Sequence, residues 1–202
     1  MLRSRLGPIL FFTLAGCSSA SEPVAPSPTT SAALNSDDVV MIRAADHGIK
    51  VKGQGVLDLG GPTADATFEF VAEQKGNGRA KGHFRMTRPR GAFVVEFTGR
   101  VTCVTTDPAF PGRARIGGVV TRNSSTDPAF LTENHEVGDD VWFRVQDGSV
   151  GGGAVDASTT YGFKPTLVNT SAEYCALPFD GLPWWNPASI FPLKEGAIRV
   201  KD

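Results

Sequence analysis

The stretch Phe93-Val94-Val95-Glu96-Phe97-Thr98 carries a large apolar side chain at every second residue. Phe93, Val95 and Phe97 share one face of the extended chain, while Glu96 and Thr98 lie on the other face. Such alternation is typical of a half-buried strand in an antiparallel sheet. This stretch therefore predicts a strand, and it suggests the fold class of the whole chain.

The same period of two recurs on both sides of this stretch. The other alternating segments are residues 66–70, 82–87 and 141–146. Glycine- and proline-rich turn signals separate them, at residues 60–62, 75–78, 88–91, 147–148 and 151–153. About nine segments have strand character, and none has the pattern of a three-turn amphipathic helix. The sequence predicts an all-β domain over residues 37–202, an antiparallel β-sandwich or small barrel.

Composition agrees with a folded β domain and excludes some partners. Of the 202 residues, 41% are hydrophobic, and 23 glycines with 14 prolines favour turns over helices. The formal net charge is -1. The densest basic segment, residues 79–90, alternates its charges along a predicted strand, which is typical of a solvated face. We therefore expect no nucleic-acid partner, since nucleic-acid binders carry a concentrated basic surface.

The amino terminus has the layout of an export signal. Met1–Arg5 holds two arginines and no acid, and residues 6–14 form a short apolar run. This run is too short for a bilayer span, which needs roughly twenty apolar residues. A charged start, a short apolar middle and small residues before a cut are typical of a signal peptide.

The four residues that close this segment, Leu14-Ala15-Gly16-Cys17, resemble the lipobox of bacterial lipoprotein signals. The resemblance implies cleavage between Gly16 and Cys17, a diacylglycerol on the Cys17 sulfur and a fatty acyl chain such as palmitate on its amine. Ser18 stands where an Asp often marks inner-membrane retention, so the implied location is the cell envelope, at the outer membrane in a Gram-negative host. The alternative is an ordinary secretory signal with a buried or paired Cys17.

A low-complexity stretch follows the lipobox. Residues 18–36 are small, polar and proline-rich, and they offer almost nothing to bury. Such a chain reaches on the order of 50 Å when it is extended. We expect three parts: a signal peptide at 1–16, a lipidated cysteine with a tether at 17–36, and a β domain at 37–202.

The remaining two cysteines are expected to pair. Assigning Cys17 to lipid leaves Cys103 and Cys175, and secreted proteins fold in an oxidising compartment. A bridge over this separation would stabilise the fold by roughly 4 kcal/mol on the chain-entropy model. The alternative is a catalytic Cys103 thiolate with His83 or His135 as its base.

Other candidate sites are weaker. Four aspartates flank a glycine-rich loop and are calcium candidates: Asp139, Asp140, Asp147 and Asp156. They lack the spacing of a recognised calcium loop, so turn formation is the simpler interpretation. The three histidines (His47, His83 and His135) have no metal-ligand spacing. We therefore predict no metal and no other cofactor.

A pair of adjacent tryptophans is a further candidate for a binding surface. Trp184-Trp185 lies in a proline-rich segment and could stack on a sugar or a protein, or else pack against the domain.

The motif Thr-Asp-Pro-Ala-Phe occurs at residues 106–110 and again at 126–130. An Asp before Pro can cap a short helical turn, so we expect two similar corners whose Phe packs on the sheet.

Several segments of the domain resemble an uncharacterised group of secreted bacterial β-domains. They are residues 82–84, 97–103, 116–123, 141–147, 171–175 and 196–200, within residues 78–201. The resemblance implies an exported β fold and brings no activity with it. From sequence we expect a lipid-anchored binding or scaffolding module of the envelope, with an envelope protein or glycan as partner. The alternative is an envelope hydrolase or carbohydrate-active enzyme.

Overall fold

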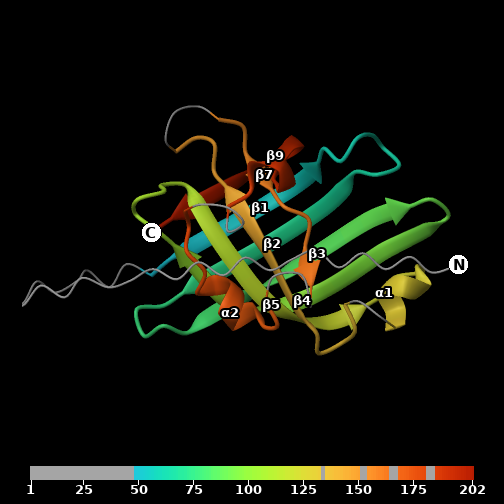
Figure 1. The fold of residues 1–202 in the computed structure, drawn as a ribbon, viewed down its shortest axis with the longest axis horizontal. Coiled ribbons are helices and arrows are strands. Elements are labelled where there is room, and N and C mark those ends of the chain that lie inside the picture. The colour runs from blue at the N-terminus through green and yellow to red at the C-terminus, as the bar shows by residue number, and fades with distance from the viewer. Residues whose placement is uncertain (1–47, 133–134, 151–153, 164–167, 181–184) are drawn as a thin grey trace, which may run out of the picture. The chain divides into compact units, whose positions relative to one another are not determined.

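The computed structural model describes residues 48–132, 135–150, 154–163, 168–180 and 185–202 (Figure 1). The predicted signal peptide and tether, with Gly16, Cys17 and Ser18, lie outside these residues. The first strand begins inside the predicted domain of residues 37–202.

The described residues form nine strands and little helix. The strands are β1 (Lys50–Leu57), β2 (Ala66–Gln74), β3 (Ala80–Arg90), β4 (Phe93–Thr106), β5 (Arg113–Asn123), β6 (Asp140–Gln146), β7 (Ala157–Ser158), β8 (Gly162–Phe163) and β9 (Phe191–Lys201). The helices are α1 (Pro128–Thr132) and α2 (Ser171–Cys175), with a 3-10 turn at Pro187–Ser189. The all-β prediction is confirmed, and each alternating segment singled out above lies within a strand.

The sheet closes into a small barrel. Its strand order is β5-β4-β3-β2-β1-β9-β7-β6, and β6 also pairs with β5, so eight strands form a ring. Every pairing is antiparallel. The short β8 pairs with β6 on the same edge as β7. Of the two architectures expected from sequence, the barrel is the one that forms.

Aromatic rings fill the barrel interior. Tyr161 is 4% exposed and stacks on Phe143, with 4.1 Å between ring centroids. Phe84 and Phe97 meet the same tyrosine ring at 5.6 and 5.8 Å, and Phe70 meets Phe143 at 5.1 Å. Alternation along each strand sends these side chains inward and polar ones outward. The interior is therefore a packed core.

The two ends of the barrel differ in what they carry. We call the end at which β1 starts and β9 finishes the basal end; the C mark in Figure 1 lies there. Residues 75–79, 107–112, 147–150 and 154–156 lie at this end because antiparallel strands alternate in direction. The opposite, apical end carries α1 and the β3–β4 turn (Figure 1).

A second layer covers part of the barrel's outside. Helix α2 packs over β4, β5 and β6, and Cys175 at its end is bonded to Cys103 of β4, with 2.05 Å between the sulfurs. Thr170 caps the helix by accepting from the Glu173 N–H at 3.2 Å. This disulfide agrees with the pairing predicted from the cysteine count. Because the Cys103 sulfur is bonded, it has no free thiol to act as a catalytic nucleophile.

The repeated motif forms two similar corners, as expected, but only Phe130 packs against the core. The Asp107 carboxylate accepts from the Ala109 N–H at 2.9 Å, and the Asp127 carboxylate accepts from the Ala129 N–H at 3.1 Å. Phe110 stacks on Phe179 at one corner. Phe130 packs against the core at the other.

In the part of the chain that the structure describes, no helix has both the length and the apolar character needed to cross a bilayer.

His135 lies inside the apical end. Its ring is 1% exposed and stacks on Phe97 at 4.3 Å and on Phe130 at 5.3 Å. Burial lowers the pKa of His135 to about 4, and a hydrogen bond with the Tyr161 backbone partly opposes this shift. The folded state therefore holds the imidazole in its neutral form.

We predict that this histidine makes the fold acid-sensitive. Below about pH 6.5 the unfolded chain takes up a proton that the folded chain refuses until about pH 4, so stability falls as the pH drops through this window. The loss from this group is at most about 3 kcal/mol. Urea unfolding of the wild type and of His135→Phe at pH 7.5, 6, 5 and 4 measures it. Relative to His135→Phe, the wild type should lose stability progressively between pH 6 and pH 4, and curves that stay parallel over this range would contradict the prediction.

Candidate functional site

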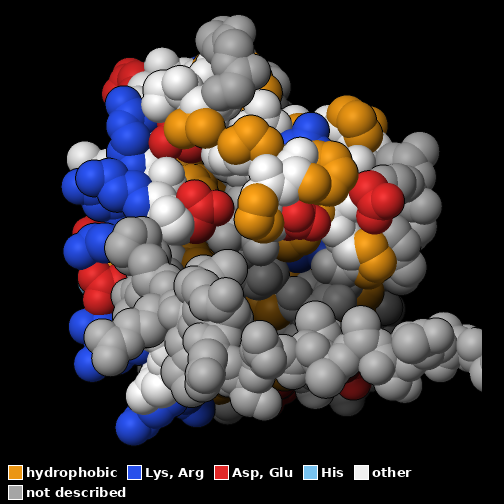
Figure 2. Space-filling model, turned by 90° about the vertical axis from the view of Figure 1, so that its left-hand side faces the viewer, with side chains coloured by type: hydrophobic (Ala, Val, Ile, Leu, Met, Phe, Trp, Pro, Cys, Tyr) orange, Lys and Arg blue, Asp and Glu red, His pale blue; other side chains and the backbone are white. Residues whose placement is uncertain are grey.

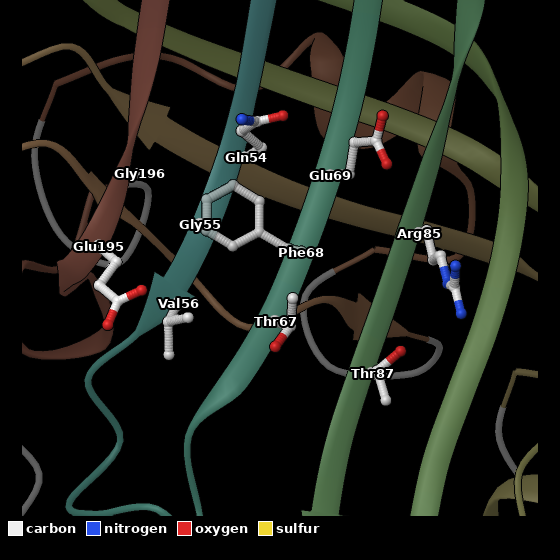
Figure 3. Close-up of a pocket in the computed structure, with 10 residues that line it drawn as sticks. All are labelled: Gln54, Gly55, Val56, Thr67, Phe68, Glu69, Arg85, Thr87, Glu195 and Gly196. Atoms are coloured by element: carbon white, nitrogen blue, oxygen red, sulfur yellow. The ribbon is translucent and has the colours of Figure 1, made fainter.

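A groove lies on the outer face of β9, β1, β2 and β3 (Figure 3). Its volume is about 620 Å³. The lining residues come from all four strands: Gln54, Gly55, Val56, Thr67, Phe68, Glu69, Arg85, Thr87, Glu195 and Gly196. We call it the outer groove.

Two glycines create the hollow. Gly55 of β1 and Gly196 of β9 face each other directly across the pair of strands. Gly196 has a φ of 101°, which side chains rarely adopt. A Cβ at Gly55 would overlap the Glu195 carbonyl oxygen, and one at Gly196 would overlap the Gln54 carbonyl oxygen. Only glycine fits at either position, and the missing side chains leave the surface open.

The groove has an aromatic floor and polar walls. Phe68 is the β2 partner of Gly55 and directs its ring toward that glycine. Glu69 and Arg85 stand on one side of the groove and Glu195 on the other (Figure 3). The Arg85 guanidinium is held by Glu96 at 2.7 Å. The outer groove therefore presents donors and acceptors of both charge signs.

A second hollow continues the groove toward the basal end. It has a volume of about 330 Å³ and shares Gln54 and Glu69 with the first. Its farther walls include Lys52 and Arg199. Together the two hollows form a trough along the strands that is longer than either one alone.

Sequence reasoning missed this groove, although a signal for it was present. Gly53 and Gly55 stand inside a strand, and glycine inside a strand often marks a close approach of two backbones. The glycine partner on β9, Gly196, is 141 residues away in the sequence. Only the β1–β9 pairing brings it opposite Gly55.

The four aspartate candidates for calcium form two separate pairs. Asp139 and Asp140 lie at the apical start of β6, and Asp147 and Asp156 lie at the basal end. Asp139 accepts from the Glu136 N–H and Asp140 from the Ser171 N–H. A single calcium site made of all four is therefore wrong, because β6 separates the pairs.

Asp147 and Asp156 instead close the barrel seam beside β9. Strand β7 pairs with β9 over only two residues. Beyond them, the Asp156 carboxylate accepts from the Ile198 N–H at 2.7 Å, and Asp147 accepts from the Val200 N–H at 3.1 Å. The second Asp156 oxygen accepts from the Gly148 N–H at 2.7 Å. These carboxylates take the place of ladder acceptors that a longer β7 would supply.

The other predicted candidates do not gather into a site. His83 is exposed on β3, His135 is buried, and His47 lies outside the described residues. Among the described residues, no group of three or more His, Cys, Asp and Glu side chains could hold a metal ion. Trp184 also lies outside the described residues.

Trp185 is buried, so of the two interpretations offered from sequence, packing against the domain is the one that fits this residue. It is 6% exposed and stacks on Phe179 at 5.9 Å. The guanidinium groups of Arg113 and Arg144 lie 4.6 and 5.4 Å from its ring centroid. A ligand could stack on this indole only by displacing these neighbours.

Buried arginines hold the second layer on the barrel. Arg115 is fully buried and donates to the carbonyl oxygens of Leu177 and Pro178. Its guanidinium also faces the rings of Tyr174 and Phe179. Burial lowers the pKa of Arg115, and an arginine remains charged through such a shift. Arg144 is also buried: the alternation of residues 141–146 puts it on the face opposite Phe143, but gives no sign that this face is covered.

Known proteins add no further assignment. A scan of protein-family models, a search of curated proteins and a search of solved structures each found no match to this chain. The outer groove is therefore the candidate site on its geometry alone.

We predict that Asp156 is a structural residue. Asp156→Ala leaves the N–H groups of Gly148 and Ile198 without their acceptor, which should lower the free energy of unfolding by about 2–4 kcal/mol. Asp107→Ala, which removes one exposed corner cap, should cost about 1 kcal/mol or less. Urea unfolding at neutral pH with the disulfide intact compares the two. Equal losses would contradict the role of Asp156 in the seam.

Proposed function

We propose that this chain is a lipid-anchored binding module of the cell envelope, and that the outer groove holds its ligand. The observation that carries the proposal is a polar-walled trough on the outside of a barrel whose inside is filled by aromatic rings. A small barrel can also enclose a ligand, but packed rings leave the strands' outer surface as the place for recognition.

The groove favours an envelope glycan over a peptide. Both neighbours of β1 and both neighbours of β2 are already paired, so a peptide cannot bind here by adding a strand. The walls offer hydroxyls at Thr67 and Thr87, the Gln54 amide and two carboxylates. Such groups match the many donors and acceptors of a sugar chain, and an envelope protein is the other partner class.

The anchor rests on the amino-terminal sequence. Leu14-Ala15-Gly16-Cys17 supplies the lipid attachment, and residues 18–36 supply a polar tether between that lipid and the barrel. Two or three acyl chains hold a protein on a membrane for long times, whereas one chain does so only marginally. The barrel would then search the envelope within reach of its tether.

One observation favours an enzyme as the second candidate. Glu69 and Glu195 line the same groove, and most glycoside hydrolases use a pair of carboxylates. An enzyme would release soluble sugar from envelope polysaccharide, and Glu69→Gln or Glu195→Gln would stop the release. Binding without release supports the binding module.

The anchor is tested by metabolic labelling with a fatty acid. The wild type should carry label, and Cys17→Ala should carry none, because the substitution removes the sulfur and the processing signal together. Probing the envelope fraction for both proteins shows whether a missing label reflects a missing acyl chain or the absence of the protein itself. Equal labelling of the two proteins would end the lipoprotein interpretation.

The groove is tested by filling it. Thr67→Trp places an indole in the trough from an exposed position of β2, and Thr121→Trp makes the same change at an exposed position of β5. Co-sedimentation with purified peptidoglycan and titration calorimetry with envelope polysaccharide measure binding. We expect Thr67→Trp to weaken binding at least tenfold and Thr121→Trp to leave it unchanged. Equal behaviour of the two variants would remove the groove as the site.

A further inference from the structure

A strip of basic side chains lies at the basal end of the same four strands. Its seven members are all exposed: Lys50, Lys52, Lys75, Arg79, Lys81, Arg199 and Lys201. We call this strip the basal basic patch. Viewed from the basal end, Lys and Arg side chains gather along one margin of the molecule, apart from a group of hydrophobic and acidic side chains (Figure 2).

The strand register places like charges opposite each other. Lys50 of β1 faces Lys201 of β9, and Lys52 faces Arg199. Like charges directly opposite on one sheet face destabilise the pair. These two exposed pairs therefore lower the stability of the β1–β9 pairing relative to neutral residues at the same positions.

Acidic neighbours offset only part of this charge. Glu73 contacts both Lys50 and Lys81 at 2.8 Å, and Arg199 is shared by Asp147 at 3.4 Å and Asp156 at 3.6 Å. The remaining members make no ion pair within the described part of the chain: Lys52, Lys75, Arg79 and Lys201. Farther along the strands, the apical half of this face carries charges of both signs, since Glu69 and Glu195 lie there with Arg85.

The chain joins the barrel at this patch. The described residues begin at Gly48, two positions before β1, and Gly48 lies against the β2–β3 turn at Lys75. A hollow of about 380 Å³ at this point is lined by Lys50, Glu73 and Lys75, among others. Gly48, where the described chain begins, therefore lies among the lysines.

We propose that the basal basic patch binds the anionic headgroups of a phospholipid membrane. The charge is complementary, the patch lies on a rigid strand face, and the covalent link toward Cys17 starts beside it. Anionic lipid surfaces attract clustered lysines and arginines in this way. The inference uses the proposed anchor to choose a membrane over another polyanion, but the contact itself needs no lipid on the protein. It holds the basal end near the membrane and leaves the apical part of the outer groove facing away.

The experiment uses the chain without its acyl groups. Residues 17–202 with Cys17→Ser keep every described contact, all of which lie within residues 48–202. Co-sedimentation is measured with vesicles of phosphatidylcholine alone and of phosphatidylcholine containing 30% phosphatidylglycerol (about one lipid in three, to give the surface potential that attracts basic residues). Binding should require the anionic lipid and should weaken as salt is raised.

The deciding variant is the double charge reversal Lys52→Glu with Lys201→Glu. Each basic residue near an anionic surface contributes roughly five-fold to binding, so the variant should bind the anionic vesicles more than about twenty-fold less tightly. Its urea midpoint should stay level or rise, since two like-charge pairs become opposite-charge pairs. Weaker binding with unimpaired folding excludes a merely structural effect.

A control with the same net charge is Arg100→Glu with Arg122→Glu, at exposed positions of β4 and β5. This control should retain most of the binding. An equal loss in both double variants, or equal binding to neutral vesicles, would overturn the proposal. Tight binding of soluble polyphosphate to the patch with no vesicle binding would also overturn it and would indicate a soluble polyanion as partner. None of these results depends on whether Cys17 is acylated or whether the groove binds glycan.

Discussion

Closure of the sheet into a ring determines which strands become neighbours on the surface of this domain. Strand β6 pairs along seven residues with β5, but β7 connects it to β9 through only two residue pairs. The seam is completed by side chains, because the Asp147 and Asp156 carboxylates accept the N–H groups of Val200 and Ile198. A closed ring leaves no open edge for another chain to pair with. It also forces β9 beside β1, which creates both the outer groove and the basal basic patch.

The filled interior explains why recognition is proposed on the outside. Tyr161 and the phenylalanines around it occupy the barrel axis, and the buried His135 seals the apical end between two rings. On the outside, α2, Phe179 and Trp185 cover part of β5 and β6, and the disulfide and the buried arginines hold them there. The face of β9, β1, β2 and β3 is left uncovered by that layer, and it carries the hollows.

The fold class could be predicted from sequence because strand alternation is a local property. Residues 93–98 show it within six positions, and the two Thr-Asp-Pro-Ala-Phe corners depend on a cap two residues away. The groove could not be predicted, since Gly55 and Gly196 become neighbours only through the β1–β9 register. Trp185 and Arg144 show the same limit. An alternating pattern separates the two faces of a strand, but it does not show that a distant segment covers the outer face.

The like-charge pairs of β1 and β9 are unfavourable within the sheet, and the proposed membrane contact gives them a role. Sheet pairing alone would select against Lys50 opposite Lys201 and Lys52 opposite Arg199. The same four strands place Glu69 and Glu195 farther along, in the groove. One sheet face is thus divided along the strand direction into a basic half beside the chain's point of departure and a polar half of both signs beyond it. A domain held on a membrane by its basic half would keep its groove exposed. The like-charge pairs destabilise the sheet slightly, and on this proposal they would in return fix the orientation of the domain.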